Sequence, residues 1–242
     1  MLTTKLENRR IAVLVADGFE KIELTLPVKA MKVAGATVEI ISLHRGKIRG
    51  MNLHKPASKV SVTKTVKDAR PDEYDALFIP GGFINPDLLR QSAEARNFVK
   101  SFALQSKPIA SLCHGPWLLA SANLLTGRKV TSWPGIRDDM VNAGAIWLNH
   151  SVVIDGNLVT SRGPQDLMAF VPAVLSLFSA EAELEKLNRD SDVSDQQANE
   201  PSQIVQKTIG LIPNLPFKWM AGLAMVALGG YALASGKRVA LG

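Results

Sequence analysis

The chain has 242 residues, which is enough for one sizeable domain with a full hydrophobic core and for an additional segment. A single cysteine excludes an internal disulfide framework, and the small net charge of +6 is scattered, without a basic stripe interleaved with aromatic residues. We therefore expect no nucleic-acid partner and no oxidised, secreted setting. Residues 1–10 are polar and predict no secretory signal peptide, so we expect a cytoplasmic protein.

The first part of the chain predicts a strand, a helix and a second strand. Residues 10–16 form an apolar run, as expected of a central parallel strand that is covered on both faces. Residues 20–33 have helical periodicity with Pro27 as an internal kink, and residues 37–43 predict the second strand. This order implies a parallel pair of strands joined by a right-handed crossover.

The next elements are predicted in the same way. Residues 44–58 are polar and predict a loop or a short hairpin, and the alternation over residues 60–66 predicts an edge strand. Residues 75–79 predict another buried strand, and residues 86–105 predict one helix with an apolar face. The chain therefore alternates strands and helices, as α/β proteins do.

Three acidic residues, Asp17, Glu20 and Glu23, follow the first predicted strand. Open α/β sheets place their sites at the carboxyl ends of strands, which favours a functional role. Acidic residues also favour the first turn of a helix, so solvated helix-start acids are the alternative. Glu23 lies between Ile22 and Leu24, which indicates partial burial, and a buried carboxylate needs a partner such as a thiol.

The only cysteine, Cys113, ends an apolar run over residues 108–112 and is followed by His114, Gly115 and Pro116. This pattern predicts a strand, a sharp turn and a helix with proline in its first turn. The N–H groups at a helix start stabilise a thiolate, so we interpret Cys113 as a nucleophile and His114 as its base or charge partner. A buried structural cysteine beside a chance histidine is the alternative.

A glycine pair, Gly81 and Gly82, follows the strand predicted over residues 75–79. Paired glycines allow backbone N–H groups to approach a ligand closely, which suits an oxyanion hole opposite Cys113. The alternative is a tight turn from strand to helix.

Several collinear motifs resemble the PfpI family, a branch of the class I glutamine amidotransferase-like superfamily. The similar stretches are residues 16–24, 79–82, 111–116, 127–139, 142–145 and 152–162. The likeness covers approximately residues 9–180. It implies an α/β fold, a flavodoxin-like three-layer sandwich with a mostly parallel central sheet.

The resemblance also implies roles for individual residues. Cys113 lies at the family's nucleophile position, His114 at its histidine position, and Glu23 at that of a carboxylate hydrogen-bonded to the cysteine sulfur. Gly81 and Gly82 fall at the backbone oxyanion site.

A third catalytic member is less well matched. In PfpI-type assemblies an acid from a neighbouring subunit orients the histidine, and Asp87 is the nearest match, which implies a homo-oligomer. One residue more than usual separates Gly82 from Asp87, so this assignment stays open.

The resemblance implies a cysteine hydrolase. Activities in the family include peptide hydrolysis, deglycation, glyoxalase-type chemistry and stress protection, so the expected partners are small carbonyl compounds, glycated proteins or peptides. In each reaction a thiolate adds to an electrophilic carbonyl, and neither a metal nor an organic cofactor is needed. The alternative is a redox-sensing or chaperone-like binding protein that uses the same cysteine.

The sequence predicts three parts. A catalytic domain covers residues 9–187 and ends in an apolar-faced helix that begins at Leu167, residues 188–208 form a polar linker that we expect to be disordered, and residues 209–242 form an apolar tail.

The apolar tail contains a run without charge, residues 219–236, at the lower limit of length for a membrane span. A membrane-associated helix is one interpretation, and a helix that packs on the domain or on another subunit is the other. Lys237 and Arg238 on the far flank oppose the positive-inside trend, so whether the tail spans, lies on or avoids a membrane stays open.

Overall fold

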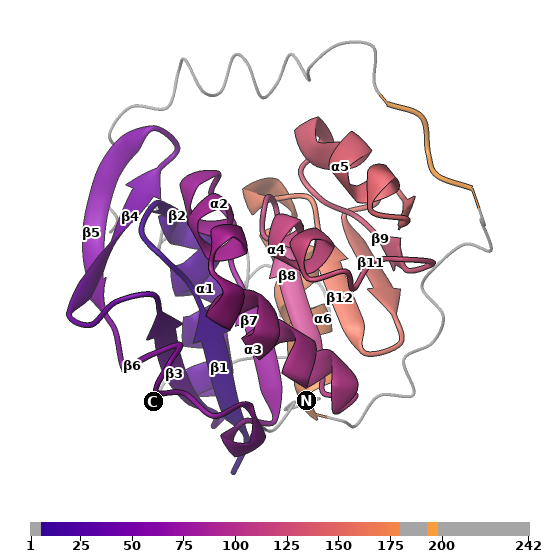
Figure 1. Cartoon of the computed structure of the whole chain (residues 1–242). Helices are drawn as coiled ribbons and strands as arrows, with labels where there is room; N and C mark the ends of the chain where they lie inside the picture. The colour runs from indigo at the N-terminus through magenta and orange to yellow at the C-terminus, as the bar shows by residue number, and fades with distance from the viewer. Residues whose placement is uncertain (1–5, 180–192, 198–242) are drawn as a thin grey trace, which may run out of the picture. The chain divides into compact units, whose positions relative to one another are not determined.

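The computed structural model describes residues 6–179 and 193–197. Its centre is a seven-stranded sheet in the order β11-β12-β8-β7-β1-β3-β6 (Figure 1). Only the edge pair β11–β12 is antiparallel, and the other five pairs are parallel. The strands are β1 Arg10–Leu14, β3 Thr37–Ser42, β6 Lys64–Thr65, β7 Ala76–Ile79, β8 Ile109–Leu112, β11 Val152–Asp155 and β12 Leu158–Ser161.

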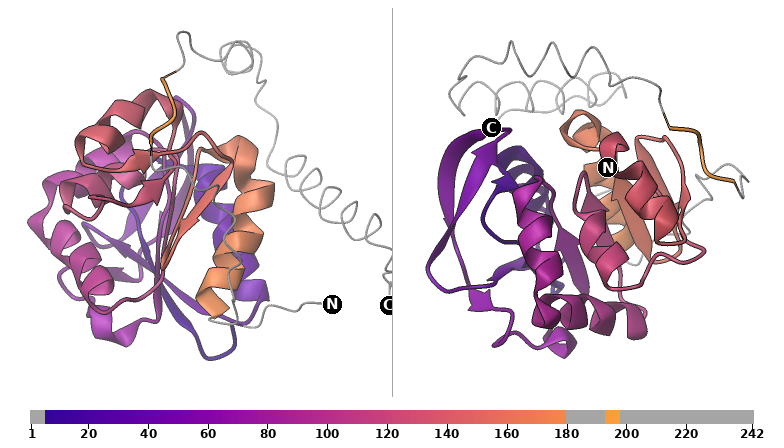
Figure 2. Two further views of the ribbon diagram at one scale, coloured as in Figure 1. Left: turned by 90° about the vertical axis from the view of Figure 1, so that its right-hand side faces the viewer. Right: turned by 45° about the horizontal axis from the view of Figure 1, so that its top comes forward.

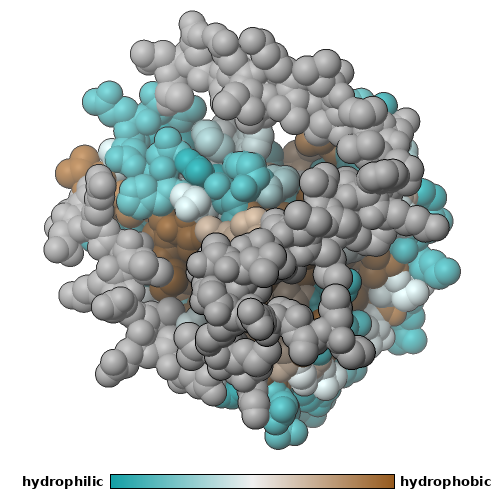
Figure 3. All heavy atoms as spheres, turned by 180° about the vertical axis from the view of Figure 1, so that it is seen from behind, coloured by the Kyte–Doolittle hydropathy of each residue, from teal (hydrophilic) through white to brown (hydrophobic). Residues whose placement is uncertain are grey.

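Helices cover both faces of this sheet, which confirms the predicted three-layer α/β sandwich (Figure 2). One face carries α2 Ile84–Gln91, α3 Ala93–Leu104 and α4 Pro116–Ser121, and the other carries α1 Lys21–Val33 and α6 Leu167–Ser179. Figure 3 shows the molecule from the side opposite to that of Figure 1, and the part of the described surface that is visible there has both hydrophobic and hydrophilic regions. Six further elements are α5 Arg137–Asn142, β9 Lys129–Val130, β10 Ile146–Trp147, η1 Pro71–Glu73, η2 Pro134–Ile136 and η3 Pro164–Asp166.

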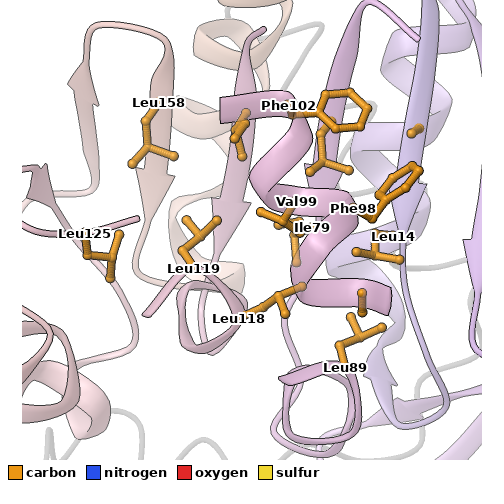
Figure 4. Close-up of a cluster of buried hydrophobic side chains, with 14 of the residues drawn as sticks. Leu14, Ile79, Leu89, Phe98, Val99, Phe102, Leu118, Leu119, Leu125 and Leu158 are labelled. Carbon is orange, nitrogen blue, oxygen red and sulfur yellow. The ribbon is translucent and has the colours of Figure 1, made fainter. Parts of the chain in front are cut away.

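Two apolar clusters hold the layers together. Side chains alternate across a strand, so Leu14 of β1 joins the cluster under α2 to α4, whereas Val13 joins the cluster under α1 and α6. In the first cluster Phe98 and Phe102 of α3 are buried against the sheet (Figure 4). Burial of both faces explains the continuous apolar run of residues 11–16.

The helix predicted over residues 86–105 is in fact two helices. The chain is extended at Ser92, and its hydroxyl accepts a hydrogen bond from the Ala95 N–H at 3.2 Å, which caps α3. Serine is a strong N-cap residue because it satisfies one of the unpaired N–H groups at a helix start. The apolar periodicity continued across this break, so periodicity alone did not reveal it.

The hairpin alternative for residues 44–58 is correct, but the edge strand predicted over residues 60–66 is divided. Strands β4 Lys47–Asn52 and β5 Lys55–Ser61 form an antiparallel hairpin, which joins the short β2 Phe19–Glu20 in a separate three-stranded sheet. Only β6 reaches the edge of the main sheet, beside β3.

The C-terminal predictions fall partly outside the described residues. The described part of the predicted last helix is α6, which runs to Ser179. Residues 180–192 and 198–242 are not described, so the apolar tail predicted over residues 209–242 lies outside the described residues. Residues 193–197 of the predicted disordered linker are ordered against the domain, because the Asp195 N–H donates to the Trp147 carbonyl oxygen at 2.8 Å. Within the described ranges no helix has the length and apolar character needed to cross a membrane.

Candidate active site

The site is built on the sharp turn between β8 and α4. Cys113 stands at this turn with φ of 58°, a left-handed conformation that is uncommon for a residue with a side chain. A Cβ at Gly115 would lie 2.4 Å from Ser111 Oγ, so only glycine fits there. Cys113 is held at both backbone groups, because its N–H donates to the Ser161 carbonyl at 3.0 Å and its carbonyl accepts from the Trp133 N–H at 2.9 Å. Strain that is held in this way is typical of functional sites.

Cys113 and His114 are in contact. The Cys113 Sγ lies 3.3 Å from His114 Nδ1, and the cysteine is only 6% exposed. Burial lowers the pKa of His114 to about 4, and the nearby charge of Asp139 partly opposes this shift. His114 is therefore a neutral imidazole at pH 7, which can accept the thiol proton.

Glu23 lies on the other side of the sulfur and is fully buried. Its Oε2 and the Cys113 Cβ converge on Gly81, where an added Cβ would lie 2.3 Å and 2.5 Å from them. Neither carboxylate oxygen has a partner at hydrogen-bond geometry among the described residues. Burial, together with the negative charge of Glu20, raises the pKa of Glu23 to about 8. At pH 7 Glu23 is therefore mainly a neutral acid, which can donate its proton to the sulfur.

The pKa of the Cys113 thiol is also raised, first by burial and then by the charge of Glu23. The N–H groups of Gly82 and His114 act in the opposite direction because they point towards the sulfur. Cys113 and Glu23 form a coupled pair in which ionisation of one opposes ionisation of the other. The resting site therefore holds a thiol, a neutral imidazole and a carboxylic acid rather than a preformed ion pair.

Gly81 and Gly82 both lie beside Cys113. Gly82 has φ of +83°, and an added Cβ there would lie 2.5 Å from both Glu20 N and Gly18 O. This close approach requires glycine. The Gly82 N–H lies near the Cys113 sulfur, and it lowers the pKa of that thiol.

Buried Asn85 holds this glycine turn, and the sequence interpretation did not include it. Its Oδ1 accepts from the Ala16 N–H at 2.7 Å, and its Nδ2 donates to the carbonyls of Pro80 and Gly81 at 2.8 and 3.1 Å. One side chain thus joins the ends of β1 and β7, the edge at which open parallel sheets carry their sites.

Asp87, the proposed third member, lies apart from His114 in this chain. It is exposed on α2, and its carboxylate accepts from the Gln91 side chain at 3.2 Å. No hydrogen bond joins Asp87 to His114 within the described residues, and the carboxylate whose charge acts on His114 is Asp139 of α5.

Two tryptophans enclose the histidine ring, and the sequence interpretation did not assign them to the site. Trp117 packs edge-on against His114 with ring centroids 5.1 Å apart, and Trp133 stacks on it at 5.9 Å with an angle of 21°. Trp133 lies in the stretch of residues 127–139, which carries part of the family resemblance. No local pattern in that stretch predicts that residues 133–139 fold back over Cys113.

Comparisons with known proteins show which family this chain resembles. The model of the DJ-1/PfpI family matches residues 9–177. "Deglycase PfpI" from Pyrococcus furiosus is 42% identical over 168 residues, which cover 69% of this chain and 98% of that protein. "Putative cysteine protease YraA" from Bacillus subtilis is 44% identical over 171 residues, which cover 70% of this chain and 98% of that protein.

Solved structures show the same fold. A two-domain protein from Anabaena variabilis with DJ-1/ThiJ/PfpI-like and ferritin-like domains matches with a TM-score of 0.69 and 33% identity, over 76% of this chain and 52% of its own. Drosophila melanogaster DJ-1beta matches with a TM-score of 0.66 over 72% of this chain and 91% of its own, and at 23% identity it supports the fold alone.

Proposed function

The chain belongs to the DJ-1/PfpI family, and from that premise we propose that it is a cysteine hydrolase for electrophilic carbonyls. Its substrates are small carbonyl compounds such as glyoxals, glycated proteins, or peptides. The observation that supports this most strongly is the contact between the Cys113 sulfur and His114 Nδ1 at 3.3 Å, on the turn that follows β8 at the carboxyl edge of the sheet.

In the proposed reaction His114 takes the thiol proton as the sulfur of Cys113 bonds to the substrate carbonyl carbon. The carbonyl π electrons move to its oxygen, and the N–H groups of Gly82 and His114 stabilise that oxyanion. Glu23 donates a hydrogen bond to the sulfur. His114 then returns its proton to the leaving amine of a peptide, and water releases the acyl group from the sulfur.

A glyoxal reacts with the same residues of the site, but the steps of its reaction follow a different order. The thiol adds to the aldehyde, a proton moves from the aldehyde carbon to the neighbouring carbonyl carbon, and a thioester forms. Water then cleaves the thioester and releases a hydroxy acid together with the free thiol. No external oxidant or reductant is consumed, since one carbon is oxidised and its neighbour is reduced.

The test compares the purified full chain with Cys113→Ala on methylglyoxal, a methylglyoxal-modified peptide and a fluorogenic peptide. Turnover of the carbonyl substrates alone that depends on Cys113 supports a deglycase or glyoxalase, and cleavage of the unmodified peptide supports a peptidase. Turnover that is equal in the folded Cys113→Ala protein, or absent in both proteins, contradicts the hydrolase proposal.

The redox-sensor alternative has less support. The thiolate is the form of cysteine that reacts with peroxide, and burial raises the pKa of the Cys113 thiol. Oxidation of Cys113 by peroxide that is faster than that of free cysteine at pH 7, with no turnover of the three substrates, would restore this alternative.

We also propose that the active unit is a homo-oligomer in which Asp87 acts on His114 of a neighbouring copy. Its exposed position on α2 suits that role. Inactive Asp87→Ala and Cys113→Ala proteins, unfolded together and refolded as a mixture, should regain part of the activity, because some mixed sites have both residues intact. A mixture that stays inactive although both proteins fold and associate would contradict the exchange of Asp87.

A further inference from the structure

Residues 193–197, which we call the C-terminal strap, lie along the outer edge of β10 (orange segment in Figure 1). The Asp195 N–H donates to the Trp147 carbonyl at 2.8 Å, and the Trp147 N–H donates to Ser194 Oγ at 2.9 Å. Both backbone groups of Trp147 on that edge are thus paired with the strap. The family match ends at residue 177, so the strap lies beyond the part of the chain that resembles the relatives.

Asp195 also accepts hydrogen bonds from two other segments of the domain. Its carbonyl accepts from Arg137 Nε at 2.9 Å, and its Oδ2 accepts from the Asn149 N–H at 2.7 Å. Arg137 is the first residue of α5, which carries Asp139, the acid whose charge acts on His114. The strap therefore holds the N-terminal end of α5, and this helix contributes to the electrostatic field at His114 through Asp139.

A chain of hydrogen bonds connects the strap to the histidine. Trp147 is 2% exposed, and its Nε1 donates to Ser132 Oγ at 3.0 Å. Ser132, which is fully buried, donates in turn to the Trp133 carbonyl at 3.1 Å. Trp133 stacks on His114 and donates its N–H to the Cys113 carbonyl. Each link is a directional contact, so a shift of the Trp147 backbone is transmitted to the ring that covers His114.

We propose that the C-terminal strap positions the Trp133 ring over His114, and that Ser194 and Asp195 are positioning residues for the Cys113–His114 pair. The catalytic importance of this positioning rests on the proposed function, but the contact between the strap and the histidine environment does not. The competing explanation is that the strap only covers an open strand edge, a need common to exposed β-strands. If the strap had only that role, its loss would leave the pKa of His114 unchanged.

The experiment uses the full chain with Ser194→Ala and Asp195→Pro combined. The first change removes the acceptor for the Trp147 N–H, and proline removes the N–H that pairs with the Trp147 carbonyl together with the carboxylate. Gln196→Ala is the matched control, because Gln196 is the exposed neighbour in the same strap. Melting temperatures establish that each variant is folded.

The first measurement is the titration of the His114 ring by NMR. In the strap variant we expect the pKa of His114 to rise from about 4 towards 6.5, because water reaches a ring that Trp133 no longer covers. The charged and titratable groups around the ring are Cys113, Asp139 and, above Trp117, Arg90, and none of them is changed. We also expect kcat/KM for methylglyoxal to fall about tenfold, mainly through kcat.

A His114 titration that matches the wild type in the folded strap variant would overturn the proposal, and so would an equal shift in Gln196→Ala. The ring titration needs no turnover. A chain that hydrolyses none of the substrates would therefore refute the proposed function while still testing the strap.

Discussion

Replacement of Glu23 by glutamine tests the charge state of the site most directly. The change keeps the shape of the side chain and removes its ionisation. Burial raises the pKa of Glu23 from 4.5 to about 8, so between these pH values the folded protein holds a proton that the unfolded chain has released. The free energy of unfolding of the wild type therefore falls as pH rises through this window, by about 1.4 kcal/mol per pH unit.

At pH 7 this difference amounts to about 3 kcal/mol, because the solution is then roughly two and a half units above the ordinary pKa of a glutamate. We expect Glu23→Gln to be more stable than the wild type near pH 7, and the gain to shrink to near zero at pH 4.5. Turnover should nevertheless slow, because the amide is a weaker hydrogen-bond donor to the sulfur than a carboxylic acid. A variant that gains stability and loses activity indicates a residue retained for function.

The assay is chemical denaturation at pH values from 4.5 to 9, with Glu7→Gln, the same change at an exposed position, as the control. Parallel stability profiles for the wild type and Glu23→Gln would refute the inferred charge state, and so would a Glu23→Gln protein that is less stable at every pH. An unchanged pH dependence of Cys113 alkylation would separate Glu23 from the thiol.

Three further substitutions, one of them paired with a control at Gly156, test the site and the core. Cys113→Ala should reduce turnover by about 10⁴-fold or more while circular dichroism shows an intact fold, and undiminished turnover would remove the nucleophile assignment. Gly81→Ala should reduce both stability and turnover strongly because its Cβ would lie 2.3 Å from Glu23, whereas Gly156→Ala, with open space but φ of +55°, should lose only about 1 kcal/mol by denaturation. Equal losses in the two glycine variants would contradict the close approach at Gly81. Phe102→Ala should reduce the free energy of unfolding by about 3–5 kcal/mol in a denaturant titration, since the ring is fully buried, and a loss below 1 kcal/mol would contradict its place in the core.

The charge states in the site also bear on the choice between hydrolase and sensor. A thiol beside a neutral imidazole reacts when substrate approaches, because proton transfer to His114 accompanies formation of the sulfur–carbon bond. A peroxide sensor instead depends on a thiolate that is present at rest. The raised pKa of the Cys113 thiol and the lowered pKa of His114 therefore favour the hydrolase.

Much of the fold could be predicted from the sequence, because the deciding interactions are local. Apolar runs such as residues 11–16 indicate strands that are buried on both faces, and the stretch from Pro108 to Pro116 indicates a strand, a turn and the start of a helix in sequence order. The break at Ser92 was missed because the apolar face of α2 and α3 continues across it, although serine is itself a capping residue.

The sequence by itself predicted the proposed nucleophile Cys113, its histidine neighbour and the glycines expected to lie close to them, because each prediction depends on a short stretch of chain. The tertiary structure alone decided which distant residues act on them. It brought Asp139 and Trp133 over His114, used Asn85 to join the ends of β1 and β7, and placed Asp195 against Trp147. These contacts join residues that are far apart in the chain, and their partners are selected by packing and by the pairing of buried backbone groups, which no local pattern encodes.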